Sequence, residues 1–424
     1  MDITARLHAL IGHAVDEIRL RDGDYLRRFP LAMASPANIA HRHFSSGAFQ
    51  QYSETEVERA LTSGLGLLSA SGLTNPEIDD SRDPIGEMIA GSAVDAFAGN
   101  GGGLALKPYA TPQAALPDIL KAGYEERLTP GGTRYFLSRH GERPLLLVNA
   151  VGIPLKLWSR FIGDQSHPYR ILIVEGRSGD LIRGGIERHA ELFDDARDIG
   201  DAIDHADIEQ LDVLAWCNGA KAAIALTEFC TKIRSLTLLS PSLLGIHGVE
   251  PRLSPFEDNM LRIFAAVTAK PPLADMLVGT LKLQGRQPDW DEFRDDPSAR
   301  AATLFRLPAR DNAEALLAPM SRGDYLINYG KRVATDSRYP IHQGLQKLQM
   351  PMLVITGDQD NMVENAFTRA ALQQWSHGGI HASVKGASHY IQDLQYVYFR
   401  ALLEQFHGFG GAPKSLARVQ IESL

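Results

Sequence analysis

The chain contains little cysteine and begins without an apolar segment. Only Cys217 and Cys230 occur in its 424 residues, which is too few for the multi-bridge disulfide framework of small secreted proteins. Its N-terminal stretch, MDITARLHALIGHAVDEIRLRDGDY, also lacks the basic start and continuous apolar core of a secretory signal. These two absences predict a protein of the reducing cytoplasm.

Long apolar runs and an excess of positive charge are missing as well. No apolar run approaches the roughly eighteen residues that a membrane span needs, so no span is expected. The formal net charge is −8, which leaves no basic surface for phosphates and argues against nucleic acid as a partner. An acidic protein partner is not excluded.

Metal and cofactor motifs are also missing. His41 and His43 in AHRHF have no third candidate ligand nearby, so a solvated loop is the better interpretation. The stretch GNGGG (99–103) does not join a strand to a helix, as phosphate loops do, and is interpreted as a linker. We therefore expect neither a metal nor a cofactor.

Short apolar runs alternate with helical patterns over about residues 124–408. Strands that alternate with helices predict parallel βαβ units, and therefore a doubly wound, mostly parallel α/β sheet covered by helices on both faces. The predicted strands include 145–148, 171–179 (ending in a glycine turn), 211–216, 236–242 and 352–357.

Three regions fall outside this alternation. Residues 1–98 carry apolar residues at helical spacing and are predicted to form a helical domain, a candidate for dimerisation or docking. Residues 243–349 form an insertion at the carboxyl end of a predicted parallel strand, where ligands bind in open α/β sheets, so we interpret them as a lid. An excursion without substrate contact would give the same pattern. The resulting boundaries are helical domain 1–98, linker 99–123, sheet domain 124–242 and 350–408, lid 243–349, and C-terminal tail 409–424.

The segment VLAWCNGAK (213–221) places Cys217 where an apolar strand turns abruptly into a helix. A nucleophile on such a turn is lifted from the sheet and lies beside the backbone N–H groups of a helix N-terminus. Small residues flank it at Ala215 and Gly219. The pattern resembles the nucleophile elbow of the α/β-hydrolase superfamily, with cysteine in place of the usual serine and alanine in place of the first glycine.

The resemblance extends to an acid and a histidine, in the superfamily's order along the chain. After the strand MLVITG, Asp360 in GDQD takes the place of the acid, with Asp358 as the competing candidate. In GASHYIQD, His389 takes the place of the histidine. The resemblance implies a catalytic set of Cys217, His389 and Asp360, whereas Cys230 is predicted to be a small buried residue in a helix.

An oxyanion hole is implied by the segment NAVGIPLKLW (149–158). Family members often carry H-G-x-P here and a tryptophan nine residues beyond the histidine. This chain has Asn149 at the histidine position and Trp158 nine residues later. The resemblance implies that the backbone N–H groups of Val151 and Asn218 hold the oxyanion, with Gly152 as the alternative to Val151.

Aromatic residues supply the predicted acyl-chain pocket. The lid sequence offers apolar surface of the kind that ligand pockets use, and DWDEFRDD (289–296) is interpreted as an exposed lid face with its aromatic residues turned inward. The predicted substrate-binding residues are Trp158, Trp216, Trp290, Phe293, Tyr325 and Tyr329.

Cysteine as the nucleophile favours acyl transfer over hydrolysis. A thiolate paired with imidazolium attacks acyl groups directly, and the resulting thioester on the enzyme is a good donor to amines, alcohols and carbanions. Cysteine-bearing members of the fold include assembly-line off-loading enzymes and Dieckmann-type cyclases, polyhydroxyalkanoate synthases and dienelactone hydrolases. In its lid and N-terminal region, this chain is more similar to the off-loading enzymes and cyclases, and to the polyhydroxyalkanoate synthases, than to the dienelactone hydrolases.

We therefore expect a cysteine-dependent acyltransferase or cyclase that takes its acyl chain from a thioester of a carrier protein or of CoA. A simple thioesterase or ester hydrolase, and a non-catalytic ligand-binding member of the fold, are the alternatives. The sequence leaves open the acyl chain, the acceptor and the oligomeric state.

Overall fold

The computed structural model describes residues 116–284, 315–409 and 419–424, except positions 178, 189, 247, 251, 359, 361, 377, 385, 386, 388 and 395. The predicted helical domain 1–98 lies outside the described residues. So do two predicted pocket residues of the lid, Trp290 and Phe293.

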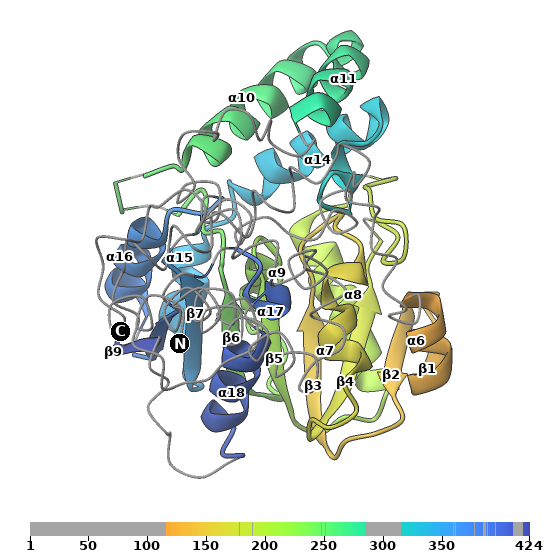
Figure 1. Cartoon of the computed structure of the whole chain (residues 1–424), viewed down its shortest axis with the longest axis vertical. Helices are drawn as coiled ribbons and strands as arrows, with labels where there is room; N and C mark the ends of the chain where they lie inside the picture. Colours follow the sequence, from red (N-terminus) through yellow and green to blue (C-terminus); the bar gives the residue numbers. More distant parts are fainter. Residues whose placement is uncertain are drawn as a thin grey trace, which may run out of the picture.

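The described residues form one sheet, whose strand order is β1-β2-β4-β3-β5-β6-β7-β8-β9 (Figure 1). Neighbouring strands run parallel from β4 to β8. The pairs at the two sides, β1 with β2, β2 with β4 and β8 with β9, are antiparallel. This arrangement confirms the doubly wound, mostly parallel sheet expected from the sequence. The strands are β1 (Tyr124–Leu128), β2 (Arg134–Ser138), β3 (Arg143–Val148), β4 (Tyr169–Glu175), β5 (Leu211–Trp216), β6 (Ile233–Leu239), β7 (Met352–Gly357), β8 (Ile380–Val384) and β9 (Val419–Ser423).

The central strands are apolar because helices cover both faces of the sheet. Every residue of β5 and of β7 is buried, as expected for parallel strands without a solvated face. Asp212 is the one charged residue of β5, and it is buried like the others. Its carboxylate pairs with Arg143 and Arg234 and accepts a hydrogen bond from Ser235. Pairing of this kind makes a buried charge tolerable.

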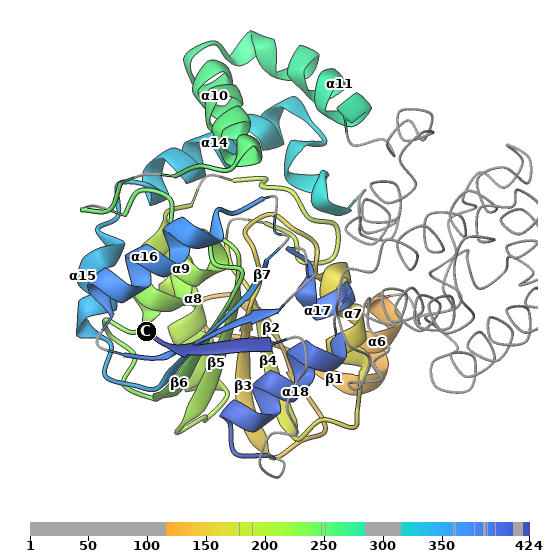
Figure 2. The same cartoon turned by 60° about the vertical axis from the view of Figure 1, so that its left-hand side comes forward.

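Two helical layers flank the sheet, and Figure 2 shows them on its opposite faces. One layer consists of α8 (Leu192–His205), α9 (Gly219–Leu226), α15 (Ile341–Lys347) and α16 (Asn365–Trp375), whose apolar residues share one core with the sheet. The other consists of α6 (Leu116–Gly123), η2 (Leu155–Trp158), α7 (Ser159–Gly163), α17 (Ile391–Leu394) and α18 (Tyr396–Phe406), which belong to a second core.

The lid helices lie beyond one end of the sheet (Figures 1 and 2). Asn218, which follows β5, contacts Tyr329 of the lid, so this end is the carboxyl end of the parallel strands. The lid packs around an apolar cluster of its own that includes Met260, Phe264 and Leu326. Its described helices are α10 (Pro255–Ala269), η3 (Pro271–Leu273), α11 (Ala274–Gln284), η5 (Ala318–Met320) and α14 (Gly323–Asp336).

Three segments differ from the sequence-based expectations. Residues 116–123, predicted as the end of a linker, form α6, which buries Leu116 and Leu120. Helix α15, within the predicted lid, instead packs against the sheet domain beside α9 and α16. The predicted C-terminal tail contains β9, which pairs with β8. Each of these segments is short, and its role in the fold depends on tertiary contacts, so local pattern did not identify it.

Candidate active site

Cys217 lies on a tight turn between β5 and α9. Its φ of 54° falls in the left-handed region, which a non-glycine residue adopts only when its surroundings enforce it. Here the Cys217 N–H donates to the carbonyl of Leu239 (3.0 Å), and the Cys217 carbonyl accepts from Ser242 (3.1 Å). A Cβ on Gly219 would lie 2.5 Å from the carbonyl oxygen of Asn149. The turn therefore requires the small residue that the elbow pattern predicted.

His389 and Asp360 meet at the same end of the sheet. His389 Nδ1 lies 2.8 Å from Asp360 Oδ2. The other carboxylate oxygen, Asp360 Oδ1, accepts from the backbone N–H groups of Met362 (2.9 Å) and Val363 (3.0 Å). Asp358, the competing acid, is exposed and does not take this position. The structure thus brings Asp360, rather than Asp358, to the histidine.

The charge state of His389 is set by its two neighbours. Burial alone would lower the pKa of His389. The charges of Asp360 and Cys217, together with hydrogen bonds to both, outweigh burial and raise that pKa well above its usual range. An imidazolium is therefore favoured between the carboxylate and the sulfur. Such a group can balance a thiolate and can later return its proton.

Cys217 and His389 open into a cavity beneath the lid, with an empty volume of about 890 Å³ that is partly open to solvent. The lid contributes apolar wall residues such as Phe264, Met320 and Val333. A cavity with apolar walls beside Cys217 suits an acyl chain better than a polar ligand.

The Val151 N–H, one of the two expected oxyanion donors, already has a hydrogen-bond partner. The Val151 N–H donates to Asn218 Oδ1 (2.9 Å), and Asn218 Nδ2 lies 3.3 Å from the hydroxyl oxygen of Tyr329. Val151 and Asn218 are thus in direct contact beside Cys217. However, the Asn218 side chain uses the N–H that an oxyanion would need, so a substrate oxygen must displace it.

We expect Asn218→Ala to accelerate acylation of Cys217 by up to about tenfold, because a hydrogen bond that competes for the Val151 N–H contributes about 0.5–1.5 kcal/mol. Asn218→Asp is the matched variant and should slow acylation, because a charged acceptor holds the N–H more strongly. Stopped-flow release of the donor thiol would measure both rates. Slower acylation in Asn218→Ala would mean that the asparagine side chain itself assists the reaction.

The other predicted pocket residues occupy different places. Trp216 lines the cavity, and its indole N–H donates to the His389 carbonyl (3.2 Å). Tyr329 also lines the cavity. Trp158 does not reach the cavity: it is fully buried in the core, and its indole N–H donates to Asn149 Oδ1 (3.0 Å). Tyr325 lies outside the cavity, with the Arg322 guanidinium 4.4 Å above its ring.

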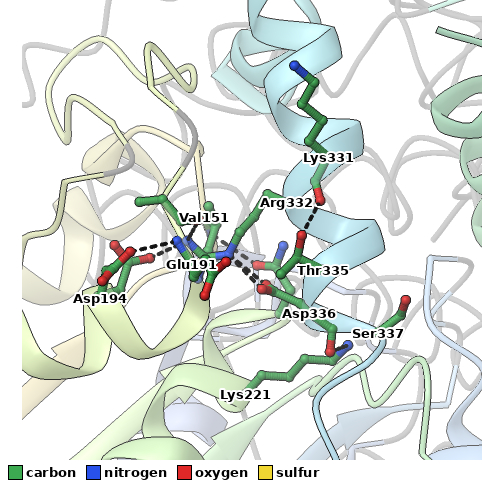
Figure 3. A network of polar contacts seen from close by, with 12 residues as sticks. Val151, Glu191, Asp194, Lys221, Lys331, Arg332, Thr335, Asp336 and Ser337 are labelled. Carbon is green, nitrogen blue, oxygen red and sulfur yellow. Dashed lines mark hydrogen bonds and ion pairs between the residues drawn. The ribbon is translucent and has the colours of Figure 1, made fainter. Parts of the chain in front are cut away.

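Three charged residues of the cavity wall were not predicted from the sequence: Lys221, Glu257 and Asp336. Figure 3 shows Lys221 extending toward the end of α14, where Asp336 faces Arg332. Burial lowers the pKa of Lys221 to about 8, although Asp336 opposes the shift. The signal in the sequence was a lysine four residues after Cys217 in the otherwise uncharged helix GAKAAIAL.

The described parts of the chain hold no group of three histidine, cysteine or acidic residues arranged for a metal ion. Within those same parts, no helix has both the length and the apolar character needed to cross a bilayer.

Comparison with known proteins identifies the fold. No known protein family and no curated protein matches the sequence. Among solved structures, a membrane phospholipase A described as a bacterial virulence factor aligns with a TM-score of 0.50 and 17% identity, over 74% of this chain and 96% of that chain. A bromoperoxidase from Bacillus anthracis aligns with a TM-score of 0.49 and 13% identity, over 67% of this chain and 100% of that one. An alpha/beta hydrolase enzyme from a Medee basin deep-sea metagenome library gives 0.47 and 14%, over 67% of this chain and 97% of that one. Identities this low bear on architecture alone. The strand order and the alignment with the phospholipase A show that this chain has the α/β-hydrolase fold.

Proposed function

We propose that this protein is a cysteine-dependent acyltransferase, which takes an acyl chain from a thioester onto Cys217 and passes it to a nucleophile other than water. The observation that carries the proposal is the position of Cys217, on a strained turn beside a histidine that is itself bonded to Asp360. In this scheme Cys217 is the nucleophile, His389 is the acid and base, and Asp360 orients the imidazole.

The first half-reaction loads the enzyme. The Cys217 thiolate attacks the carbonyl carbon of the thioester, and the carbonyl oxygen gains negative charge. The backbone N–H groups of Val151 and Asn218 stabilise this oxyanion once the Asn218 side chain has moved aside. The C–S bond to the donor then breaks, and the departing thiolate takes the proton from His389.

The second half-reaction unloads the enzyme. Neutral His389 accepts a proton from the acceptor as that acceptor attacks the acyl carbon. The bond to Cys217 breaks, and the sulfur leaves as a thiolate beside the new imidazolium. Apolar side chains make up most of the cavity wall, and partial exclusion of water from the acyl-enzyme would favour this route over hydrolysis.

Hydrolysis of a thioester or ester is the alternative, since the fold is shared with a membrane phospholipase A. The proposed donor is a thioester of CoA or of a carrier protein, and the predicted docking or dimerisation role of residues 1–98 belongs to the same proposal. A protein that only binds a ligand under the lid would have no need of a reactive Cys217.

Intact-mass spectrometry distinguishes transfer from hydrolysis. With octanoyl N-acetylcysteamine thioester alone, the wild-type protein should accumulate one octanoyl adduct, because exchange between thiols is near thermoneutral while water is held back. Added amine or alcohol acceptors should discharge the adduct to an amide or ester. Cys230→Ala should form the same adduct, whereas Cys217→Ala should form none.

Free octanoate as the only product with every acceptor, with no adduct at any time, would establish a hydrolase instead. Cys217→Ser supplies a further contrast. Its oxoester should discharge to acceptors much more slowly than the thioester, because an alkoxide is a poorer leaving group than a thiolate. Equal turnover of the two proteins would contradict the transfer mechanism.

A further inference from the structure

Lys221 brings a buried ammonium group into the acyl cavity. All eight residues of α9 are buried, and Lys221 is the only charged one among them. Its side chain lines the same cavity as Cys217 and His389. Placing a charge in an apolar wall is costly unless the charge has partners, so the contacts of Lys221 indicate what the position is for.

Two backbone carbonyls fix the ammonium group. Lys221 Nζ donates to the carbonyl of Leu244 and, at 3.5 Å, to the carbonyl of Asp336 at the end of α14. An ammonium group has three N–H donors and no acceptor. Within the described residues these two bonds leave one donor, at a group that lines the cavity. An oxygen atom of a bound ligand is the partner that would satisfy it.

The surrounding charges favour a neutral oxygen over an anion. Two carboxylates, Glu257 and Asp336, line the same cavity. Asp336 is bonded to the buried Arg332 guanidinium at 2.8 Å and also interacts electrostatically with Lys221. A carboxylate on the ligand would face both of these acids, whereas a ketone carbonyl accepts the hydrogen bond without adding charge.

We propose that Lys221 is an oxygen-binding subsite of the acyl cavity, and that the preferred donor is an acyl thioester whose chain carries an oxo group within reach of Nζ. The proposal rests on the proposed acyl transfer for the thioester, but the subsite itself is a property of binding. A site built around a hydrogen-bond donor discriminates against chains that lack the acceptor, because the donor is then left buried and unpaired.

Binding to Cys217→Ala tests the subsite without any covalent step. The probes are octanoyl N-acetylcysteamine thioester and its 3-oxo, 5-oxo and 7-oxo analogues, titrated calorimetrically. One oxo position should bind at least about tenfold more tightly than the plain chain, as expected for a hydrogen bond to a charged donor. Adding Lys221→Met should reduce that preference to less than threefold. The control variant is Lys331→Met. Lys331 lies on α14, is exposed and points away from Lys221 (Figure 3), so this variant should preserve the preference for the oxo chain.

Equal binding of all four chains to Cys217→Ala would overturn the proposal even if the lysine variant failed to fold. Tighter binding of a chain that ends in a carboxylate, such as the 7-carboxyheptanoyl thioester, would overturn it in favour of an anion site. If the Lys221→Met variant still preferred an oxo chain, the proposal would also fail. Lys221 would then serve only to bind the Leu244 and Asp336 carbonyls. An oxo preference in binding together with no acyl adduct on wild-type Cys217 would support the subsite while rejecting acyl transfer.

Discussion

Replacing Asp360 with asparagine is expected to lower kcat for acyl transfer by about 10³–10⁴-fold, the loss typical when the orienting carboxylate of such a set is neutralised. Asp360 Oδ2 contacts His389 Nδ1, and Asp360 Oδ1 is fixed by two backbone N–H groups. An amide at this position has nearly the same shape but cannot stabilise the imidazolium, and its NH₂ group favours the wrong tautomer. Steady-state release of the donor thiol would measure the effect.

Asp358→Asn is the matched control for this prediction. Asp358 lies two residues away in the same turn and is exposed, and its backbone N–H donates to the Val384 carbonyl whatever its side chain. Turnover by the Asp358→Asn variant should stay within about threefold of the wild type, as for most surface substitutions. A larger loss in Asp358→Asn than in Asp360→Asn would show that Asp358, and not Asp360, is the acid.

Iodoacetamide at neutral pH should alkylate Cys217 at least about a hundred times faster than Cys230, since only a thiolate reacts. Both side chains are partly buried, so neither cysteine is fully shielded from the reagent. Burial raises the pKa of Cys230, whereas Cys217 lies beside a histidine that favours the protonated state. Peptide mass spectrometry over time would give both rates in one experiment.

His389→Ala should remove most of this difference, because the thiolate then loses its imidazolium partner. Cys217→Ala provides the control, in which only the slow labelling of Cys230 remains. Slow and equal labelling of both cysteines in the wild type would reject an activated nucleophile. It would favour a protein that binds its ligand without chemistry.

The sequence predicted the parts of the site that local geometry determines. Cys217 and Gly219 could be recognised because a sharp turn between strand and helix needs small residues around the nucleophile. Asp360 and His389 could be recognised because each follows a buried strand in a short turn, and the structure brings these two together. The roles assigned to these residues remain predictions of the proposed function.

Features that depend on distant contacts could not be predicted. The bond from Asn218 to the Val151 N–H depends on where two loops from different strands meet. Trp158 was expected in the pocket, but its direction is set by Asn149 and by core packing. The role of Lys221 emerges only when Leu244 and the end of α14 come within reach of its ammonium group.

Helix α14 forms one wall of the cavity and is tied to the core by a buried arginine. Arg332 is 1% exposed and lies 2.6 Å from Asp195 of α8 and 2.8 Å from Asp336. Breaking a buried pair of this kind typically costs about 3–5 kcal/mol, so we expect this wall to keep its position when a ligand binds. If the proposed acyl transfer holds, the cavity is then expected to limit the length of the acyl chain. Each buried methylene should make the free energy of binding more favourable by about 0.8 kcal/mol until the chain fills the cavity. A further methylene should then weaken binding through steric strain. Under that proposal, the length of the transferred chain would be selected by the protein, whatever mixture of donors the cell supplies.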